Sequence, residues 1–395
     1  MTTALGGIRV LDLSRILAGP WCAMILGDLG AEVIKIESPG FGDDTRLFGP
    51  PFKDGESAYF LTANRNKKSL LCDLKSEEGQ GILRELAAGA DVLIENFRFG
   101  QMEKFGLALD DLRAANPKLI TCSISGYGRE SPVAERAGYD FMIQAESGLM
   151  SIIGEPDGQP MKVGVAISDL ITGNNAAQAV LAALLARHNT GRGQHIDLAL
   201  LDCQVAALAN VASAYLMTGR APERQGNAHA AVAPYEPFET ADEPIALAVG
   251  NNRQFETLCR VLELDDVLDD PRYVDNASRV NNRDTLKPAL ETVFKTDGRD
   301  AWLKILHAAG LPAGALRTVD EVLESPEIAA RGLIREVDHT AMGKSRLMGS
   351  PLKLSDTPVI DPQAPPMLSQ HTVEVLTDVL GWRRDDAEDY ANRLA

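Results

Sequence analysis

The sequence predicts an α/β fold, with a large domain built on a parallel sheet and a smaller domain of helices and short strands. In the first 200 residues, short runs of Val, Ile and Leu alternate with stretches of helical periodicity, which is typical of a parallel sheet covered on both faces. From about residue 225, short strands mix with charged helices and frequent turn signals. We therefore expect a large domain of residues 1–220 and 330–395 and a small domain of residues 225–325.

The large domain is expected to open with a strand, a helix and a second strand. Residues 8–13 form a short apolar run, Pro20 suits the first turn of a helix that continues to about residue 29, and residues 31–37 form the next strand. This order is that of a dinucleotide-binding fold, but the connecting loop has no G-x-G-x-x-G pattern. The loop therefore argues against an oxidoreductase that uses NAD.

The alternation of strands and helices then continues along the chain. Prolines at 358, 362, 365 and 366 exclude a regular helix or a central strand there, and a last helix is expected to begin near Thr372. The predicted strands are residues 68–74, 91–96, 119–124 and 195–200, and the predicted helices are residues 77–88, 174–188 and 202–217.

Composition excludes several classes of protein. The net charge of −17 disfavours nucleic acid and anionic membranes as partners. The five cysteines are scattered and lack C-x-x-C spacing, which argues for reduced thiols and against a metal site. We found no apolar run of about 18 residues, no signal sequence in residues 1–7 and no phosphate-binding G-x-x-x-x-G-K-[ST] loop. A cytoplasmic protein is expected, or one of the mitochondrial matrix if the source is eukaryotic.

Asp169 is the most informative residue of the chain. It ends an apolar run and directly precedes an Ala/Leu-rich helical pattern, so it is expected in the first turn of a helix with Ser168 as the N-cap. That position favours negative charge by about 0.3–1 kcal/mol, which predicts an ionised carboxylate at neutral pH. Such a carboxylate is either a nucleophile or only a helix cap.

Basic residues gather near the ends of predicted strands. Residues 65–68 precede one strand, Lys75 follows it, and Arg98 and Lys104 flank aromatic residues after the next. Ligands of parallel sheets bind at the carboxyl ends of the strands, so this set suits a phosphorylated ligand. Ordinary solvated charge is the alternative for each residue taken singly. Asn96 and Phe97 follow a strand and could offer an amide and a ring for stacking, or merely pack.

Many short motifs occur in one order along the chain, from about residue 5 to 200 and again beyond 226. Together they resemble the class III CoA-transferase family (CaiB/BaiF, formyl-CoA transferase-like). The motifs are residues 18–20 (AGP), 27–37 (GDLGAEVIKIE), 42–46 (GDDTR), 64–69 (NRNKKS), 95–97 (ENF), 125–128 (SGYG), 137–140 (AGYD), 164–173, 226–227, 234–238 (PYEPF), 250–252 (GNN) and 370–372 (QHT).

The resemblance implies a Rossmann-like large domain that binds CoA, a small domain that contributes to the acyl site, and a homodimer of interlocked chains. It also implies that Asp169 is the nucleophile, which carries first the acyl group and then CoA, with CoA as a co-substrate and no other cofactor. By family position, the residues expected along CoA are Ile16, Ala18, Cys72, Lys75, Asn96, Phe97, Lys104, Arg136, Tyr139 and Asp140.

The residues of these motifs are most similar to those of the branch of the family that transfers CoA from succinyl-CoA to glutarate or hydroxymethylglutarate. A dicarboxylic acceptor needs a cation for its far carboxylate, and Arg46 and Arg65 are candidates, although either could be structural. Phe48 and Tyr59 fall where relatives shape the acyl pocket. Gly250 and Asn251 fall where some relatives have a glycine-rich loop over the site, although this chain has less glycine there.

Two alternatives share this fold. An α-methylacyl-CoA racemase would move an α-proton with a histidine and an acid, without a covalent intermediate. The racemase pattern places a histidine directly before the acid at position 140, where this chain has Tyr139, so transfer is favoured. A protein that binds CoA without activity is the other alternative, and the intact Asp169 argues against it.

Overall fold

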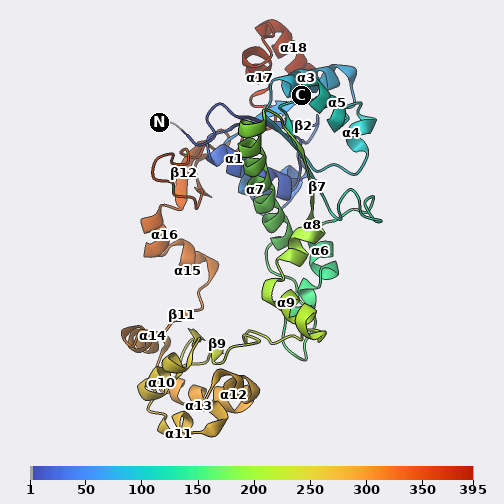
Figure 1. Ribbon diagram of the computed structural model, residues 1–395. Helices are drawn as coiled ribbons and strands as arrows, with labels where there is room; N and C mark the ends of the chain where they lie inside the picture. Colours follow the sequence, from blue (N-terminus) through green and yellow to red (C-terminus); the bar gives the residue numbers. More distant parts are fainter. Residues whose placement is uncertain (1–2, 395) are drawn as a thin grey trace. The chain divides into compact units, whose positions relative to one another are not determined.

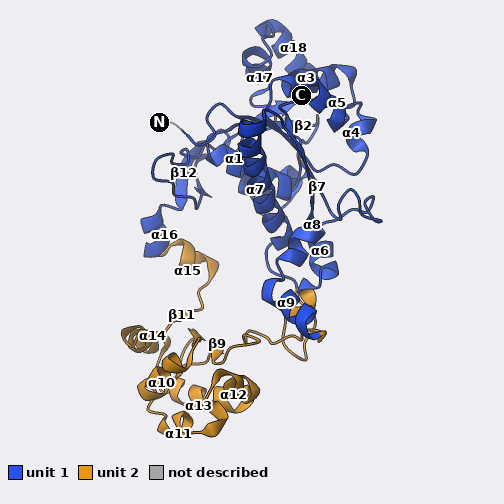
Figure 2. Ribbon diagram, viewed as in Figure 1, with its two compact units in different colours: residues 1–149, 162–218, 326–395 blue, residues 150–161, 219–325 orange. Residues whose placement is uncertain are grey.

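The computed structural model describes residues 3–394 and divides into two compact units. Unit 1 comprises residues 1–149, 162–218 and 326–395, and unit 2 comprises residues 150–161 and 219–325 (Figure 2). The short segment 150–161 therefore groups with unit 2, whereas the sequence placed it in the large domain. Residues 1, 2 and 395 of the predicted large domain lie outside the described residues.

Unit 1 is built on a six-stranded, wholly parallel sheet, as the sequence predicted. The strands lie in the order β5-β2-β1-β6-β7-β8. Their bounds are β1 Arg9–Asp12, β2 Glu32–Glu37, β5 Lys67–Leu71, β6 Val92–Glu95, β7 Ile120–Ser125 and β8 His195–Ala199.

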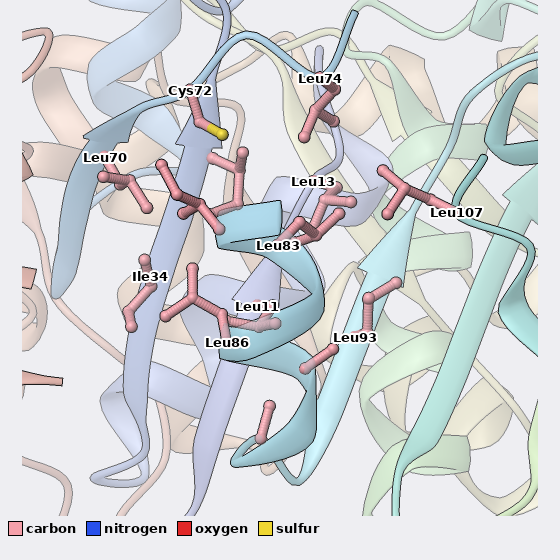
Figure 3. Packing of buried hydrophobic residues seen from close by; sticks show 14 of the residues in the cluster. Leu11, Leu13, Ile34, Leu70, Cys72, Leu74, Leu83, Leu86, Leu93 and Leu107 are labelled. Atoms are coloured by element: carbon pink, nitrogen blue, oxygen red, sulfur yellow. The ribbon is translucent and has the colours of Figure 1, made fainter. Parts of the chain in front are cut away.

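Alternate residues of the strands cover the two faces of this sheet with apolar side chains. On one face, Leu11, Ile34 and Leu93 pack under α3 Glu77–Ala88, together with the helices α5 Leu109–Ala115, α17 Thr372–Asp378 and α18 Arg384–Leu394 (Figure 3). On the other face, their neighbours Val10 and Val33 pack under α1 Ala18–Asp28 and α7 Ile167–Thr190 (Figure 1). This double cover explains why apolar residues stand at consecutive positions of the strands, such as Val10 and Leu11 or Val33 and Ile34.

The sheet reverses its strand order between β1 and β6. From β1 the chain moves outward to β2 and β5, and then returns to the other side of β1 to form β6. The loops that leave β1 and β6 are therefore neighbours at the carboxyl edge, which is where ligands bind in open parallel sheets. Two hydrogen bonds join these loops: the Arg15 amide donates to Asn96 Oδ1 at 2.8 Å, and Asn96 Nδ2 donates to the Arg15 carbonyl at 2.7 Å.

A buried cluster of charges lies beneath the same loops. Lys67 Nζ contacts Asp12 Oδ2 at 2.8 Å, and Lys35 Nζ contacts Asp43 Oδ2 at 2.8 Å and Asp12 Oδ2 at 3.9 Å. Lys35 also donates to the Ser14 carbonyl at 2.9 Å, which ties the cluster to the loop after β1. Burial lowers the pKa of Lys67 to about 8. Residues 67 and 68 begin β5, and the side chain of Lys67 is taken up by this internal cluster. A ligand-binding role of residues 65–68 stays a prediction.

The predicted helix of residues 202–217 is wrong as a single element. The structure has α8 Leu200–Ala206 and α9 Ala209–Thr218, which meet at an angle of 74°. Ala209 adopts the left-handed conformation, with φ of 46°, and this interrupts the helix. No single helix in residues 3–394 is long and apolar enough to cross a membrane, although this bent pair passes a test of length and composition.

Unit 2 has its own core around Phe238, Leu247 and Phe294, and a three-stranded sheet in the order β11-β10-β9. The remaining elements of both units are η1 Asp44–Leu47, β3 Phe52–Lys53, β4 Glu56–Ser57, α2 Ala58–Thr62, α4 Gln101–Lys104, α6 Asp140–Glu146, η2 Leu149–Ile152, β9 Tyr235–Phe238, β10 Ile245–Ala248, α10 Asn252–Val261, α11 Asp265–Leu268, η3 Pro271–Tyr273, α12 Asn276–Asn281, α13 Arg283–Phe294, α14 Arg299–Ala308, β11 Ala313–Ala315, α15 Val319–Leu323, α16 Pro326–Arg331, β12 Ile334–His339 and β13 Gly343–Met348.

Replacing Asp12 with alanine is expected to lower the free energy of unfolding by about 3–5 kcal/mol, because Lys67 would stay buried without its carboxylate. Urea denaturation measures this loss. The control is Glu374→Ala, which removes a half-exposed partner of Lys68 and should cost less than about 1 kcal/mol. Equal losses in the two variants would contradict the importance of the buried cluster.

Candidate active site

Two clefts lie side by side at the carboxyl edge of the sheet in unit 1. One, of about 150 Å³, is lined by the loops after β1, β6 and β7 and by Asp169. The other, of about 390 Å³, is lined by the loops after β2, β5 and β6. Arg15, Phe97 and Arg98 line both clefts, so the two are adjacent where the strand order reverses. An extended ligand could follow this edge from one cleft into the next.

The structure brings together most of the residues expected along CoA. Eight line the two clefts and two do not. The first cleft contains Ile16, Ala18, Asn96, Phe97, Arg136 and Tyr139, and the second contains Cys72, Lys75 and again Phe97. Lys104 ends the short helix α4 at an exposed position and lines neither cleft. Asp140 lies beside the first cleft without lining it.

Asp169 lies in the first turn of α7, as predicted, but Ser168 is not the cap. The N-cap position is Ala166, which has no capping side chain, and the Ser168 hydroxyl instead donates to Gln204 Oε1 at 2.9 Å. Asp140 takes the role of the cap, because its Oδ1 accepts the Ser168 backbone N–H at 2.8 Å. The sequence could not reveal this partner, since it comes from 28 residues earlier in the chain.

The environment of Asp169 differs from the ionised, dipole-stabilised carboxylate that the sequence predicted. Its side chain is buried, with an exposed fraction of 9%. Burial, and to a smaller extent the negative charge of Asp140, raise the pKa of Asp169 to about 7. A backbone hydrogen bond from Ala18 acts in the opposite direction and lowers this pKa. The position in the helix would favour ionisation, but loss of solvent outweighs it. A carboxyl group that titrates near neutrality is a frequent mark of a functional site.

The loop between β1 and α1 is held in an unusual conformation beside Asp169. Ile16 has φ of 70°, in the left-handed region that branched side chains rarely adopt. Asp43 Oδ1 accepts the Ile16 N–H at 3.2 Å, and Asn96 accepts the N–H of Arg15. The Asn96 amide is therefore occupied by the loop. A contact of Asn96 with a ligand stays a prediction. The ring of Phe97 packs edge to face on that of Phe105, with ring centroids 5.7 Å apart.

Arg46 and Arg65 are both paired with carboxylates of the chain itself. Arg46 makes two bonds to Glu37, at 2.8 and 2.7 Å, and Arg65 makes two to Asp28, at 2.9 and 2.5 Å. The Arg65 side chain is buried and does not line the cleft of Asp169. In each guanidinium, Nε and Nη2 are paired with an internal carboxylate. These pairs favour the structural alternative, and a contact of either arginine with a substrate stays a prediction.

The other residues expected around the acyl group fall in two places. Phe48 and Tyr59 pack edge to face with ring centroids 5.4 Å apart, and the charge of Asp169 helps to raise the pKa of Tyr59 after burial. Tyr59 therefore lies within electrostatic reach of Asp169. Gly250 and Asn251 belong to unit 2, where Asn251 caps α10 by accepting the Gln254 N–H at 2.9 Å. Their contribution to the acyl site stays a prediction.

Arg15 lines both clefts, and its place there was not predicted from the sequence. Arg15 follows β1 at the point where the strand order reverses, and that position could have revealed it. The pairing of Gln144 with Asp140 was also missed, although their spacing of four residues on one helix is a recognisable signal. Among residues 3–394, no group of three or more His, Cys, Asp or Glu side chains is arranged to hold a metal ion.

A comparison with known proteins decides the family. The model of CoA-transferase family III matches residues 5–372. The chain belongs to this family. It is thus an enzyme of the CoA-transferase class, and its two clefts lie in the part of the chain that the family model covers.

Named members of the family are similar over nearly the whole chain. The human succinyl-CoA:glutarate CoA-transferase is 42% identical, covering 97% of this chain and 87% of its own length. The succinate–glutarate CoA-transferase of Agrobacterium fabrum is 45% identical, with 95% of each chain covered. A crystal structure of a CaiB/BaiF family protein from Brucella suis is 44% identical, with a TM-score of 0.86 over 96% of this chain and all of that one. The fold is therefore that of the family.

Replacing Asp169 with asparagine is expected to stabilise the protein at pH 8. The folded protein holds a proton on Asp169 up to about pH 7, whereas an unfolded aspartate loses it near pH 4, so wild-type stability falls between these values. The free energy of unfolding of Asp169→Asn should exceed that of wild type by about 1–3 kcal/mol at pH 8, and the gap should close toward pH 4. Denaturant titrations across this range measure it. A gap that does not depend on pH would contradict the raised pKa.

Proposed function

We propose that this CoA-transferase moves CoA from succinyl-CoA to a short dicarboxylic acid, with glutarate as the favoured acceptor, and that Asp169 is the nucleophile. One observation carries the proposal: Asp169 lines the first cleft from the N-terminal turn of α7, and a second cleft adjoins the first through shared lining residues. The two relatives named for succinate or succinyl-CoA and glutarate, at 42% and 45% identity, support the substrates.

In the first half of the reaction, the ionised carboxylate of Asp169 attacks the thioester carbonyl of succinyl-CoA. The C–S bond breaks, which leaves a mixed anhydride between Asp169 and succinate and a CoA thiolate. The thiolate then attacks the aspartyl carbonyl of the anhydride and releases succinate, so that CoA is held on Asp169 as a thioester. This division of one exchange into covalent steps is the benefit of nucleophilic catalysis.

In the second half, a carboxylate of glutarate attacks the aspartyl thioester and releases the CoA thiolate. The thiolate attacks the glutaryl carbonyl of the new anhydride, which yields glutaryl-CoA and restores the Asp169 carboxylate. One thioester replaces another, so no nucleoside triphosphate is needed. The backbone N–H of Ala18, which donates toward Asp169, and the N-terminus of α7 are suited to stabilise the negative oxygen of each tetrahedral stage.

Charge in the clefts supports anionic substrates despite the acidic chain. Arg15, Arg98 and Arg136 line the first cleft, and Lys75 lines the second. Their side chains are at exposed positions, so they can reach phosphate or carboxylate groups without loss of a buried pair. With Arg46 and Arg65 committed to internal carboxylates, these residues are the cations proposed for CoA phosphates and for the far carboxylate of the acceptor.

Incubation with succinyl-CoA and no acceptor is expected to increase the mass of the protein by that of CoA less water. Hydroxylamine should convert the adduct to a hydroxamate on the peptide that contains Asp169, because hydroxylamine attacks the carbonyl of an aspartyl thioester and releases CoA. Mass spectrometry of the intact and digested protein measures both. The adduct should be absent from Asp169→Ala and present in Asp110→Ala, a control whose carboxylate is 94% exposed.

An adduct that persists in Asp169→Ala would contradict the proposed nucleophile. Absence of any adduct, combined with deuterium uptake at the α-carbon of a 2-methylacyl-CoA, would instead favour the racemase. That result would indicate proton abstraction and not acyl transfer.

The acceptor is tested separately, with succinyl-CoA as donor and a panel of monocarboxylic and dicarboxylic acids. We expect the highest kcat/KM for glutarate and at least tenfold lower values for monocarboxylic acids of equal length, because these lose one charge-assisted contact. Chromatography of the CoA esters measures the rates. Higher kcat/KM values for the monocarboxylic acids would contradict the dicarboxylate proposal without affecting the role of Asp169.

A further inference from the structure

Asp140 is held next to the nucleophile by contacts that leave it little capacity for a ligand. Its Oδ1 accepts the backbone N–H of Ser168 at 2.8 Å, and its Oδ2 accepts Gln144 Nε2 at 2.7 Å. Gln144 is fully buried, and its Oε1 accepts the Val163 N–H at 2.8 Å. The carboxylate of Asp140, at the start of α6, is therefore fixed from both sides, and it contacts α7 at Ser168, the residue before Asp169.

We propose that Asp140 is a positioning residue that acts through Asp169: it caps α7 at Ser168 and places a fixed negative charge beside the nucleophile. This inference rests on the proposed function, in which Asp169 attacks the thioester. It replaces the expected contact between Asp140 and CoA, since both carboxylate oxygens already accept hydrogen bonds within the protein.

The cap and the charge have different consequences. As a cap, Asp140 satisfies one of the free N–H groups at the start of α7 and so fixes the first turn, from which Asp169 projects. As a charge, it disfavours the ionised form of Asp169, which makes that carboxylate more basic and hence a stronger nucleophile once ionised. A neutral cap such as serine would provide only the first effect. The nearby hydroxyl of Ser168 does not act as such a cap, because it donates to Gln204.

Other charges around the cleft are arranged differently from Asp140. Arg15 pairs with Asp44 at 3.0 Å and Arg136 with Glu146 at 2.5 Å, all at exposed positions where solvent screens their effect. Burial and the charge of Asp140 are the two causes that raise the pKa of Asp169. The remaining charged or titratable groups around the cleft are Tyr59, Arg98, Glu135 and Tyr139.

Asparagine at position 140 separates the two roles. It keeps an oxygen for the Ser168 N–H, and asparagine is among the best capping residues, but it has no charge and gives up the bond from Gln144. Asp140→Ala removes both the cap and the charge. Glu146→Gln is the matched control, because it takes one negative charge from the same helix at the exposed pair with Arg136.

The test is the pH dependence of kcat/KM for succinyl-CoA, whose acid limb reports ionisation in the free enzyme. Asp140→Asn and Asp140→Ala should both move the acid limb down by about one pH unit. Relative to its own plateau, kcat/KM at pH 5.5 should therefore rise about tenfold. Asp140→Ala should also lower the melting temperature more than Asp140→Asn, and Glu146→Gln should leave the acid limb in place.

An acid limb that stays at the wild-type pH in Asp140→Asn would overturn the proposal and leave Asp140 as a helix cap only. Loss of the CoA adduct in Asp140→Asn at unchanged melting temperature would also overturn it, since that result places Asp140 in contact with the reacting atoms.

Failure of the proposed function can be distinguished from failure of this inference, because the effect of the Asp140 charge on the pKa of Asp169 can also be measured by protein stability, without catalysis. The stability gap between Asp169→Asn and its parent opens near the pKa of an unfolded aspartate and levels off near the folded pKa of Asp169. The pH at which the gap levels off should therefore move down by about one unit when Asp140→Asn is also present. A wild-type protein without an adduct, but with this shift, would reject the nucleophile and retain the interaction between the two carboxylates. Absence of the shift would reject the interaction itself.

Discussion

The hydrogen bond from the Ser168 N–H to Asp140 is the contact on which the site depends. It joins α6 to the start of α7, and it sets the first turn of the helix from which Asp169 enters the cleft. The same contact brings a second carboxylate next to Asp169 in a place with little solvent. The geometry that fixes Asp169 is thus also the geometry that disfavours its ionisation.

The parallel sheet provides the other half of the arrangement. Reversal of the strand order places the loops after β1 and β6 next to one another, and Asn96 joins them by accepting from and donating to the Arg15 backbone. Below, Asp12 and Asp43 are paired with Lys35 and hold the loop that contains Ile16. Polar contacts to the backbone therefore hold the loop beside the cleft, and they stabilise the unusual φ of Ile16.

Sequence reasoning predicted the parallel sheet because its strands are apolar on both faces, and it predicted Asp169 because the helical pattern begins beside it. It failed where a partner is distant in the chain. Ser168 resembles a cap by every local rule, yet Asp140 takes that role, and Arg65 resembles a ligand cation, yet Asp28 neutralises it. The break in the helix at Ala209 was also not predicted, because the left-handed φ there is adopted by an alanine and not by a glycine. Local patterns describe elements well and long-range polar pairs poorly.

The most direct test of this account is a titration of the Asp169 carboxyl group itself. NMR spectra of protein labelled with carbon-13 at aspartate carboxyl carbons, with the signal assigned by its absence in Asp169→Asn, would follow its ionisation as the pH is raised. The account predicts a midpoint near pH 7, because burial and Asp140 both oppose the charge. A midpoint near 4, the value of a solvated aspartate, would contradict it.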